Sequence, residues 1–346
     1  MPLFFIAFAL AMLIALFATP LVSVLANKTG ALDKPDARKV HKKPIPRIGG
    51  LAIYIAFITA VISILALADL PMDSFKSIAG LLFSATLIML VGLIDDYKNL
   101  PANVKLFGQI VAASVLVFLF DVRIDFITDP FGDYIYLEWF AAPATIFWLV
   151  GISNTVNLID GLDGLAAGVS AIAALTILMV ALQDNFLLIA ILTAALAGAA
   201  IGFLAFNFNP ASIFMGDSGA LFLGFSLAAI SIIGSVKSAA TIALFVPILA
   251  LGIPIFDTTF AIIRRIRGHV PIFKPDKGHL HHRLLALGFN HRQAVLLMYV
   301  ISALLGLSAV ALTEVSSQFA ALILILVFVV IIFGAKKIGI FSIRTN

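Results

Sequence analysis

The chain of 346 residues contains no cysteine, and Asp, Glu, Lys and Arg together make up only 12% of it. The absence of cysteine excludes disulfides, thiolate zinc sites, iron–sulfur clusters and cysteine nucleophiles. The scarcity of charge excludes an ordinary soluble domain, in which about one residue in four is charged. Hydrophobic residues make up 62% of the sequence, and the mean hydropathy is +1.15. We therefore predict an integral membrane protein.

Long apolar stretches recur along the whole chain. A membrane-spanning helix needs about 20 mostly apolar residues, and about eleven stretches approach this length. They cover residues 3–25, 48–68, 78–94, 104–120, 139–156, 165–182, 186–205, 219–236, 239–256, 294–313 and 318–335. No Lys or Arg precedes the first stretch, so we interpret it as a retained helix and not as a signal peptide. The prediction is an all-α polytopic membrane protein with a single domain over residues 1–346, because no loop can hold a soluble domain.

The basic residues divide unequally between alternate loops. All but three of the 22 Lys and Arg residues fall in the loops at about 26–47, 95–103, 157–164, 206–218 and 257–293, in the C-terminal tail, or at adjoining span ends. Only Lys76, Arg123 and Lys237 fall on the other side. By the positive-inside rule the first set is cytoplasmic. We therefore expect the N-terminus outside and the C-terminus in the cytoplasm.

Five clusters of polar residues fall on this same predicted face. The first loop is strongly basic and ends in Arg47-Ile-Gly-Gly50 at the start of a span. Backbone amides at a Gly-rich helix start, together with Arg47, would suit a phosphate. A plain positive-inside loop attracted to anionic lipids explains the same residues equally well.

The second cluster is an adjacent pair of carboxylates, Asp95 and Asp96, at the end of an apolar stretch, with Lys105 at the start of the next. Like-charged acids at a membrane boundary need a cation or polar partners to stay ionised, so they indicate a functional site. A solvated helix end is the plainer alternative.

The third cluster runs from Asn154 through Asn157, Asp160 and Asp163 to Gly164. In a helix, the three-residue spacing puts Asn154, Asn157 and Asp160 on one face. The two Asp-Gly steps would then break the helix and expose oxygen atoms and backbone amides, which suit Mg²⁺ and phosphates. An ordinary turn between helices is the alternative.

The fourth cluster places Asp217 between glycines directly before an apolar stretch, where it is either a helix cap or a metal ligand. The fifth contains His279, His281, His282 and Arg283. Their close spacing does not match a zinc site, so anion or sugar recognition is favoured over zinc, with a basic juxtamembrane segment as the alternative. Asp257 is interpreted as a cap of the next helix.

Carboxylates, carboxamides and basic groups without any thiol suit a hard cation facing polyanions, as in nucleoside diphosphate chemistry. The order of four motifs also resembles the polyprenyl-phosphate N-acetylhexosamine-1-phosphate transferases, of glycosyltransferase 4 type, over about residues 20–300. These motifs are Leu93-Ile-Asp95-Asp96, Asn154-x-x-Asn157-x-x-Asp160-Gly-Leu-Asp163-Gly-Leu, Met215-Gly-Asp217-Ser-Gly and His279-Leu-His281-His282-Arg283.

The segment Lys34-Pro-x-x-Arg38-Lys-x-His41 and the His-x-His-His-Arg loop look more like one bacterial branch of this family. The resemblance implies transfer of GlcNAc-1-phosphate from UDP-GlcNAc to undecaprenyl phosphate with release of UMP, as the first membrane step of a teichoic acid, O-antigen or related polymer. UDP-MurNAc-pentapeptide transferases, similar except for three consecutive histidines, are the alternative within the family. A membrane transporter is the alternative from another class, but its charges should lie near the bilayer midplane.

Roles for individual residues are also implied by the resemblance. Mg²⁺ would be the cofactor, with Mn²⁺ as a substitute, and the site would face the cytoplasm at a bacterial inner membrane. The partners would be the two substrates and the bilayer; a homodimer is left open, and no nucleic acid is expected. The implied roles are metal binding by Asp217 and Asn157; catalysis by Asp95, Asp96, Asp160 and Lys105; and substrate binding by Arg47, Asn154, Asp163, His279, His281, His282 and Arg283.

The implied reaction is a direct attack of the lipid phosphate on the sugar-bearing phosphorus. A phosphate monoester has a second pKa of about 6, so most of the acceptor is already dianionic at pH 7 and a general base would add little. We therefore expect Asp95 and Asp96 to act by electrostatics and positioning. A covalent aspartyl intermediate is the alternative.

Overall fold

The computed structural model describes residues 2–33, 44–67, 72–128, 134–235, 245–268, 278–315 and 317–337. Most of these residues are helical, as a lipid environment requires, because only helices and closed barrels satisfy their own backbone there. The helices are α1 (Leu3–Thr29), α2 (Gly50–Leu65), α3 (Met72–Lys98), α4 (Ala102–Phe118), the 3₁₀ turn η1 (Glu138–Phe140), α5 (Ala141–Ile159), α6 (Leu165–Gln183), α7 (Leu187–Asn207), α8 (Gly216–Ser235), α9 (Phe245–Ala250), α10 (Gly252–Arg267), α11 (Leu280–Ala286), α12 (His291–Glu314) and α13 (Ser317–Lys337).

Seven helices in the described part are long and apolar enough to cross a membrane: α1, α3, α5 with η1, α6, α7, α8 and α12. Helices α2 and α4 and the segment Leu322–Gly334 of α13 are apolar but shorter. Every predicted stretch except 239–256 therefore coincides with one apolar helix. The prediction of an all-α polytopic membrane protein is confirmed at this level.

The prediction of one continuous span over 239–256 is wrong. Within its described part, α9 ends at Ala250 and α10 begins at Gly252, so the helix is interrupted at Leu251. Helix α10 then continues to Arg267, through residues that were predicted to be loop. A run of apolar residues cannot reveal such a break, because hydropathy measures composition and not backbone continuity.

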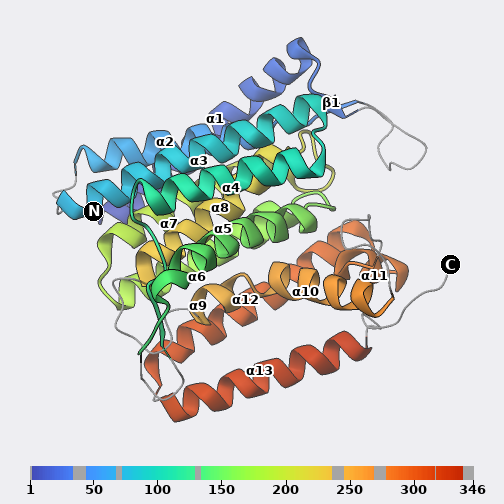
Figure 1. The fold of residues 1–346 in the computed structure, drawn as a ribbon. Coiled ribbons are helices and arrows are strands. Elements are labelled where there is room, and N and C mark those ends of the chain that lie inside the picture. The colour runs from blue at the N-terminus through green and yellow to red at the C-terminus, as the bar shows by residue number, and fades with distance from the viewer. Residues whose placement is uncertain are drawn as a thin grey trace.

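The helices form layers around α7 and α8 (Figure 1). The apolar windows of these two helices are 83% and 89% buried, against 33% for α1 at the outside. Helices α1, α2 and α3 lie on one side of the bundle, and α13 lies on the other side, beyond α12 (Figure 1). Large exposed side chains such as Phe17 and Phe333 lie on these outer helices, where lipid would cover them.

The start of α8 is held closely by two neighbouring helices. A Cβ added at Gly50 of α2 would collide with the backbone nitrogen of Gly219, and one at Gly92 of α3 would lie 2.5 Å from the Cα of Ser218. Only glycine allows these backbones to approach so closely. The packing therefore fixes the position of the first turn of α8.

Two short hairpins supplement the helices. Strands β1 (Leu32–Asp33) and β2 (Ile45–Pro46) pair with each other, and β3 (Phe126–Thr128) pairs with β4 (Tyr134–Tyr136). Strand β2 and the residues that follow it also bond to the segment before α8: Phe214 N donates to Pro46 O at 2.7 Å, and Gly50 N donates to Met215 O at 2.8 Å. These bonds hold Arg47 beside the start of α8.

Candidate active site

Asp95 and Asp96 lie in the last turn of α3, yet they are only 4% and 3% exposed. The helix ends because Asn99 adopts a positive φ of 48°. The chain then turns back, and Leu100 N donates to Asp95 Oδ1 at 2.6 Å. The turn therefore satisfies one oxygen of Asp95 and leaves the other to a basic partner.

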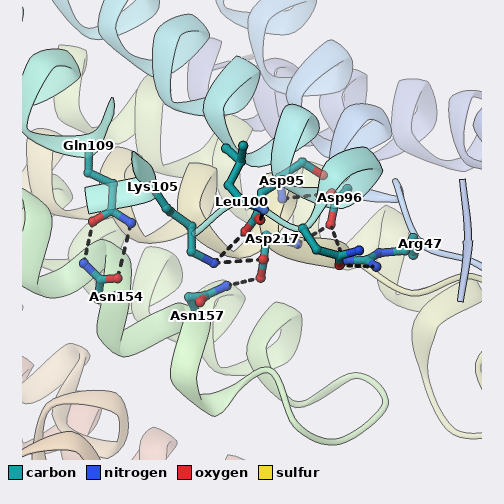
Figure 2. A network of polar contacts seen from close by, with 11 residues as sticks. Arg47, Asp95, Asp96, Leu100, Lys105, Gln109, Asn154, Asn157 and Asp217 are labelled. Atoms are coloured by element: carbon teal, nitrogen blue, oxygen red, sulfur yellow. Dashed lines mark hydrogen bonds and ion pairs between the residues drawn. The ribbon is translucent and has the colours of Figure 1, made fainter. Parts of the chain in front are cut away.

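Lys105, in the first turn of α4, provides that partner. Its Nζ lies 2.7 Å from Asp95 Oδ2 and 2.9 Å from Asp217 Oδ2. One ammonium thus joins carboxylates from the end of α3 and the start of α8 (Figure 2). Without a cation between them, two such carboxylates would repel each other at low dielectric.

Asp96 is bound to the first turn of α8. Its Oδ1 accepts from Asp217 N at 2.8 Å, and its Oδ2 accepts from Ser218 N at 3.1 Å. These N–H groups have no partner inside their own helix, and the helix dipole favours a negative charge at this position. Arg47 approaches the same carboxylate, with Nη2 3.5 Å from Oδ1. Asp96 therefore caps α8 from a different helix.

Amide side chains of α4 and α5 complete the set of polar contacts in Figure 2. Asn157 Nδ2 donates to Asp217 Oδ1 at 2.6 Å. One turn earlier, Asn154 and Gln109 of α4 exchange two hydrogen bonds, at 2.6 and 3.2 Å. Gln109 is 1% exposed, so this reciprocal pair fixes α4 against α5 within the buried part of the site.

The two Asp-Gly steps form the turn between α5 and α6, as predicted. Asp160 ends α5, and Gly164 begins α6 with a positive φ of 80°. Asp163 Oδ2 accepts from Asn209 Nδ2 at 2.9 Å and from Ala211 N at 3.1 Å. Its carboxylate therefore joins this turn to the segment between α7 and α8.

Asp160 lies in the most negative surroundings of the site. Burial and the nearby charges of Asp217, Asp96 and Asp163 raise the pKa of its carboxyl to about 8. Within the described residues its side chain has no hydrogen-bond partner. A group of this kind is a suitable neighbour for a bound cation, which would offset the repulsion.

The histidines gather around the short helix α11. The rings of His279 and His281 are parallel, with centroids 5.9 Å apart, and the ring of His282 lies 4.2 Å from that of His281. A Cβ added at Gly161 would lie 2.5 Å from His281 Nε2, so the cluster packs directly on the Asp-Gly turn. Burial and the neighbouring histidines lower the pKa of His281 to about 3, so its ring is neutral at pH 7.

A cavity of about 860 Å³ lies between α5, α10 and α11. Along α5 its lining changes from Phe147 and Trp148 to Asn154 and Asn157. At the polar end the histidines and Arg265 of α10 also line it. The cavity is therefore apolar along most of its length and polar where it meets the site.

The structure brings most of the predicted site residues into one region, but in two groups. Asp95, Asp96, Lys105, Asn157 and Asp217 form the connected network, while the histidines line the cavity beside it. Arg283 bonds locally to the segment before α11, where its Nε donates to Gly278 O at 3.1 Å. The predicted functional roles of these residues stay predictions.

Two contributors were missed in the sequence. Gln109 is a polar residue one turn after Lys105 in an apolar helix, a signal that could have been noticed. His291 accepts from Asp163 N at 3.0 Å, and nothing in the local sequence indicates this contact. The predicted segment from Lys34 to His41 lies outside the described residues.

The oxygen donors of the site fit a hard cation. The Lys105 ammonium already lies between two carboxylates, which indicates that the position favours positive charge. Within the described ranges, however, no three His, Asp or Glu side chains gather as a metal site. Mg²⁺ typically takes one or two carboxylates and completes its shell with substrate phosphates and water, and its binding here stays a prediction.

Comparison with known proteins gives a consistent set of relatives. A family model described as glycosyl transferase family 4 matches residues 78–235. A probable undecaprenyl-phosphate N-acetylglucosaminyl 1-phosphate transferase of Bacillus subtilis is 43% identical over 95% of this chain and 89% of its own. A decaprenyl-phosphate N-acetylglucosaminephosphotransferase of Mycobacterium leprae is 40% identical, over 84% and 79%. A phospho-N-acetylmuramoyl-pentapeptide-transferase of Listeria monocytogenes is 36% identical, over 65% and 74%.

Proposed function

The chain belongs to the polyprenyl-phosphate hexosamine-1-phosphate transferases of glycosyl transferase family 4, and we propose that it transfers GlcNAc-1-phosphate from UDP-GlcNAc to undecaprenyl phosphate, with release of UMP. One observation carries the proposal: the carboxylate, lysine and amide network opens beside a cavity that is apolar along its length and polar at one end. A lipid phosphate is likewise apolar along its chain and polar at its phosphate end. The product would begin a cell-envelope glycopolymer such as a teichoic acid.

The donor diphosphate would bind at the network together with Mg²⁺. Asp217 and the amide of Asn157, 2.6 Å apart, are the residues that would hold the ion. When bound, Mg²⁺ would neutralise charge on the diphosphate during transfer. Lys105 would contact the phosphates, because its ammonium already bridges Asp95 and Asp217 and remains partly exposed, at 19%.

The acceptor would place its prenyl chain along the apolar part of the cavity and its phosphate at the polar end. Trp148 and Ile255 belong to the apolar lining, and Arg265 and His282 to the polar end. In this position the phosphate faces Asn157, and through it the proposed metal ligand. The geometry thus favours direct attack of one substrate on the other.

Asp96 would not act as a general base in this reaction. Both of its oxygens accept backbone hydrogen bonds from α8, and the acceptor phosphate is already largely dianionic at pH 7. The residue instead holds Asp217 in place. A nucleophilic aspartate would require a free carboxylate oxygen at the phosphorus, which Asp96 does not offer in this arrangement.

We also propose that the site faces the cytoplasm of a bacterial inner membrane. The native chain has no cysteine, so single-cysteine variants can report the orientation. Lys28, in the last turn of α1, and Lys76, in α3, are both exposed and lie at opposite predicted ends of the spans. In intact cells a membrane-impermeant maleimide should label Lys76→Cys, and it should label Lys28→Cys only after permeabilisation. The reverse pattern would contradict the orientation.

The test of the reaction uses purified protein in detergent with UDP-[¹⁴C]GlcNAc, undecaprenyl phosphate and Mg²⁺. Transfer of label to lipid, release of UMP and loss of both with EDTA are expected. Asp217→Asn should be inactive, and Asp121→Asn, on the opposite predicted face, should be fully active. Activity with UDP-MurNAc-pentapeptide alone would assign the chain to the other branch. If no UDP-sugar labels the lipid, the proposal is contradicted. The alternative of a membrane transporter would then be tested by measuring solute flux in liposomes.

A further inference from the structure

Asp257 lies in the middle of α10, and its role is not explained by the reaction scheme above. It is 3% exposed, and it does bind the start of the next helix: Oδ1 accepts from Leu280 N at 2.8 Å. Its second oxygen, Oδ2, lies 2.9 Å from Nδ1 of His279, which is 5% exposed. Both oxygens of one buried carboxylate are therefore used at the junction of α10 and α11.

The second contact determines where His279 carries a proton. An ionised carboxylate can only accept hydrogen bonds, and the Leu280 N–H already occupies Oδ1. The bond at Oδ2 therefore requires a hydrogen on Nδ1 of His279. In a neutral imidazole this leaves Nε2 as the unprotonated nitrogen.

His279 is also in contact with the cavity beside the site. Asp257, which holds Nδ1 of the same ring, is not among the residues that line the cavity. The ring of His279 also stacks in parallel on His281, which in turn packs against Gly161. Asp257 thus orients the first member of a row of rings that ends at the Asp-Gly turn of the site.

We propose that Asp257 is a positioning residue that keeps Nδ1 of His279 protonated and presents Nε2 to the substrates in the cavity. This rests on the proposed function in one respect: it assigns the atom that faces the phosphate and sugar groups. A carboxylate behind an imidazole commonly fixes the ring orientation and its tautomer. Asp257 itself would touch neither substrate.

Asp257→Asn gives a sharp test because the side chain keeps its shape while one acceptor oxygen is replaced by a donor NH₂ group. Leu280 N–H is always a donor, so the amide oxygen of the new side chain must face it. The NH₂ group then faces His279 Nδ1, which must become an acceptor. His279 would take the other tautomer and offer Nε2–H to the cavity.

The tautomer can be measured directly by ¹⁵N NMR of histidine-labelled protein in detergent, with His279→Gln to identify the signal among the six histidines. We expect a protonated Nδ1 in the native protein and an unprotonated Nδ1 in Asp257→Asn. An unprotonated Nδ1 in the native protein would overturn the proposal, whether or not the variant folds. No substrate is needed, so this result is independent of the proposed reaction.

Kinetics provide the second readout. Asp257→Asn should lower kcat/KM about tenfold or more, as loss of such supporting partners does elsewhere. In a His279→Gln background the same substitution should change kcat/KM less than twofold, because the group it positions is gone. An equal loss in both backgrounds would mean that Asp257 is only structural and would overturn the proposal. A tautomer switch in a protein that transfers no sugar phosphate would instead reject the proposed function alone.

Discussion

The carboxylate of Asp96 accepts a hydrogen bond from the backbone N–H of Asp217, with 2.8 Å between the two atoms. The residues are 121 positions apart in the sequence. Asp96 therefore fixes the backbone of Asp217, while Lys105 and Asn157 fix its side chain. This arrangement makes Asp96 a support of the proposed metal ligand rather than a participant in proton transfer.

Replacing Asp96 with Asn tests this role. The amide keeps one acceptor and directs an NH₂ group at a backbone N–H, so the first turn of α8 should shift. We expect activity to fall about 10- to 100-fold, as for other residues that support a metal ligand, and the Mg²⁺ concentration for half-maximal activity to rise. Both are measured by lipid labelling over a Mg²⁺ titration.

The pH profile separates this explanation from general base catalysis. Asn cannot be deprotonated, and the defect comes from geometry, so high pH should not restore the activity of Asp96→Asn. Full recovery at pH 9 or above would contradict the positioning role. Asp121→Asn is the matched control, because Asp121 lies on the opposite predicted face and is well exposed, with 60% of its side chain accessible.

A second prediction concerns Lys105. In Lys105→Gln the carboxylates of Asp95 and Asp217 lose their shared cation, so the protein without Mg²⁺ should lose about 1–3 kcal/mol of stability. Added Mg²⁺ neutralises the same charges and should raise the unfolding temperature of the variant more than that of the native protein. Thermal unfolding in detergent with Mg²⁺ or EDTA measures this, with Lys98→Gln, at an exposed position, as control. Equal shifts in all three proteins would argue against a shared cation position.

The location of the site could be predicted from the sequence more easily than its connections. Sorting Lys and Arg between loops placed Asp95, Asn157 and Asp217 at the same ends of their spans, and the structure brings all three to one network. The prediction worked because each residue lies at the end of a long apolar run. In a bundle of membrane-spanning helices the chain crosses back and forth, so every helix end lies at one of the two membrane surfaces.

The connections depended on tertiary packing, which no local pattern encodes. The local sequence around Asp96 does not indicate that its partners are the backbone groups at the start of α8, because the approach depends on how Gly92 of α3 and Gly50 of α2 pack against that turn. The break at Leu251 was missed for a similar reason: the residues on both sides are apolar. Gln109 had a visible signal, but its pairing with Asn154 required the structure.

The close packing of α2 against α8 gives a third prediction. A methyl group at Gly50 would meet the backbone of Gly219, so Gly50→Ala must push the two helices apart. We expect a loss of about 1–3 kcal/mol of stability, with reduced activity because Asp217 lies in the same turn. Gly334→Ala in α13 is the matched control, since a Cβ there has nothing within 4 Å and the residue does not line the cavity. Similar unfolding temperatures for the two variants would contradict the argument.

The Gln109 and Asn154 pair allows a double-mutant cycle. Each single change to Leu leaves a buried amide without its partner and should cost about 1–3 kcal/mol. The double variant removes both polar groups, so the two costs should not add, and a coupling of about 1 kcal/mol or more is expected. Thermal unfolding of the four proteins measures it. Additive losses would mean that the reciprocal bonds do not stabilise the fold.

The last prediction concerns proton release at Asp160. Its pKa of about 8 lies above the ordinary value of 3.8, so the carboxyl is mostly protonated at pH 7 without a cation. The shift also means that the cation-free fold is most stable, with respect to this group, below about pH 4, and that this stability is lost progressively as the pH rises from about 4 to 8. A divalent cation nearby would favour the ionised form. Binding of Mg²⁺ with UDP-GlcNAc at pH 7 should therefore release close to one proton.

Calorimetry in buffers of different ionisation enthalpy measures this release. It should approach zero at pH 9.5, where Asp160 is already ionised, and the apparent Mg²⁺ affinity should rise about tenfold per pH unit from pH 6 to 8. Asp160→Asn should abolish both effects, because an amide does not titrate. If the variant releases as many protons as the native protein at pH 7, another group is responsible, and the negative surroundings of Asp160 do not serve the cation.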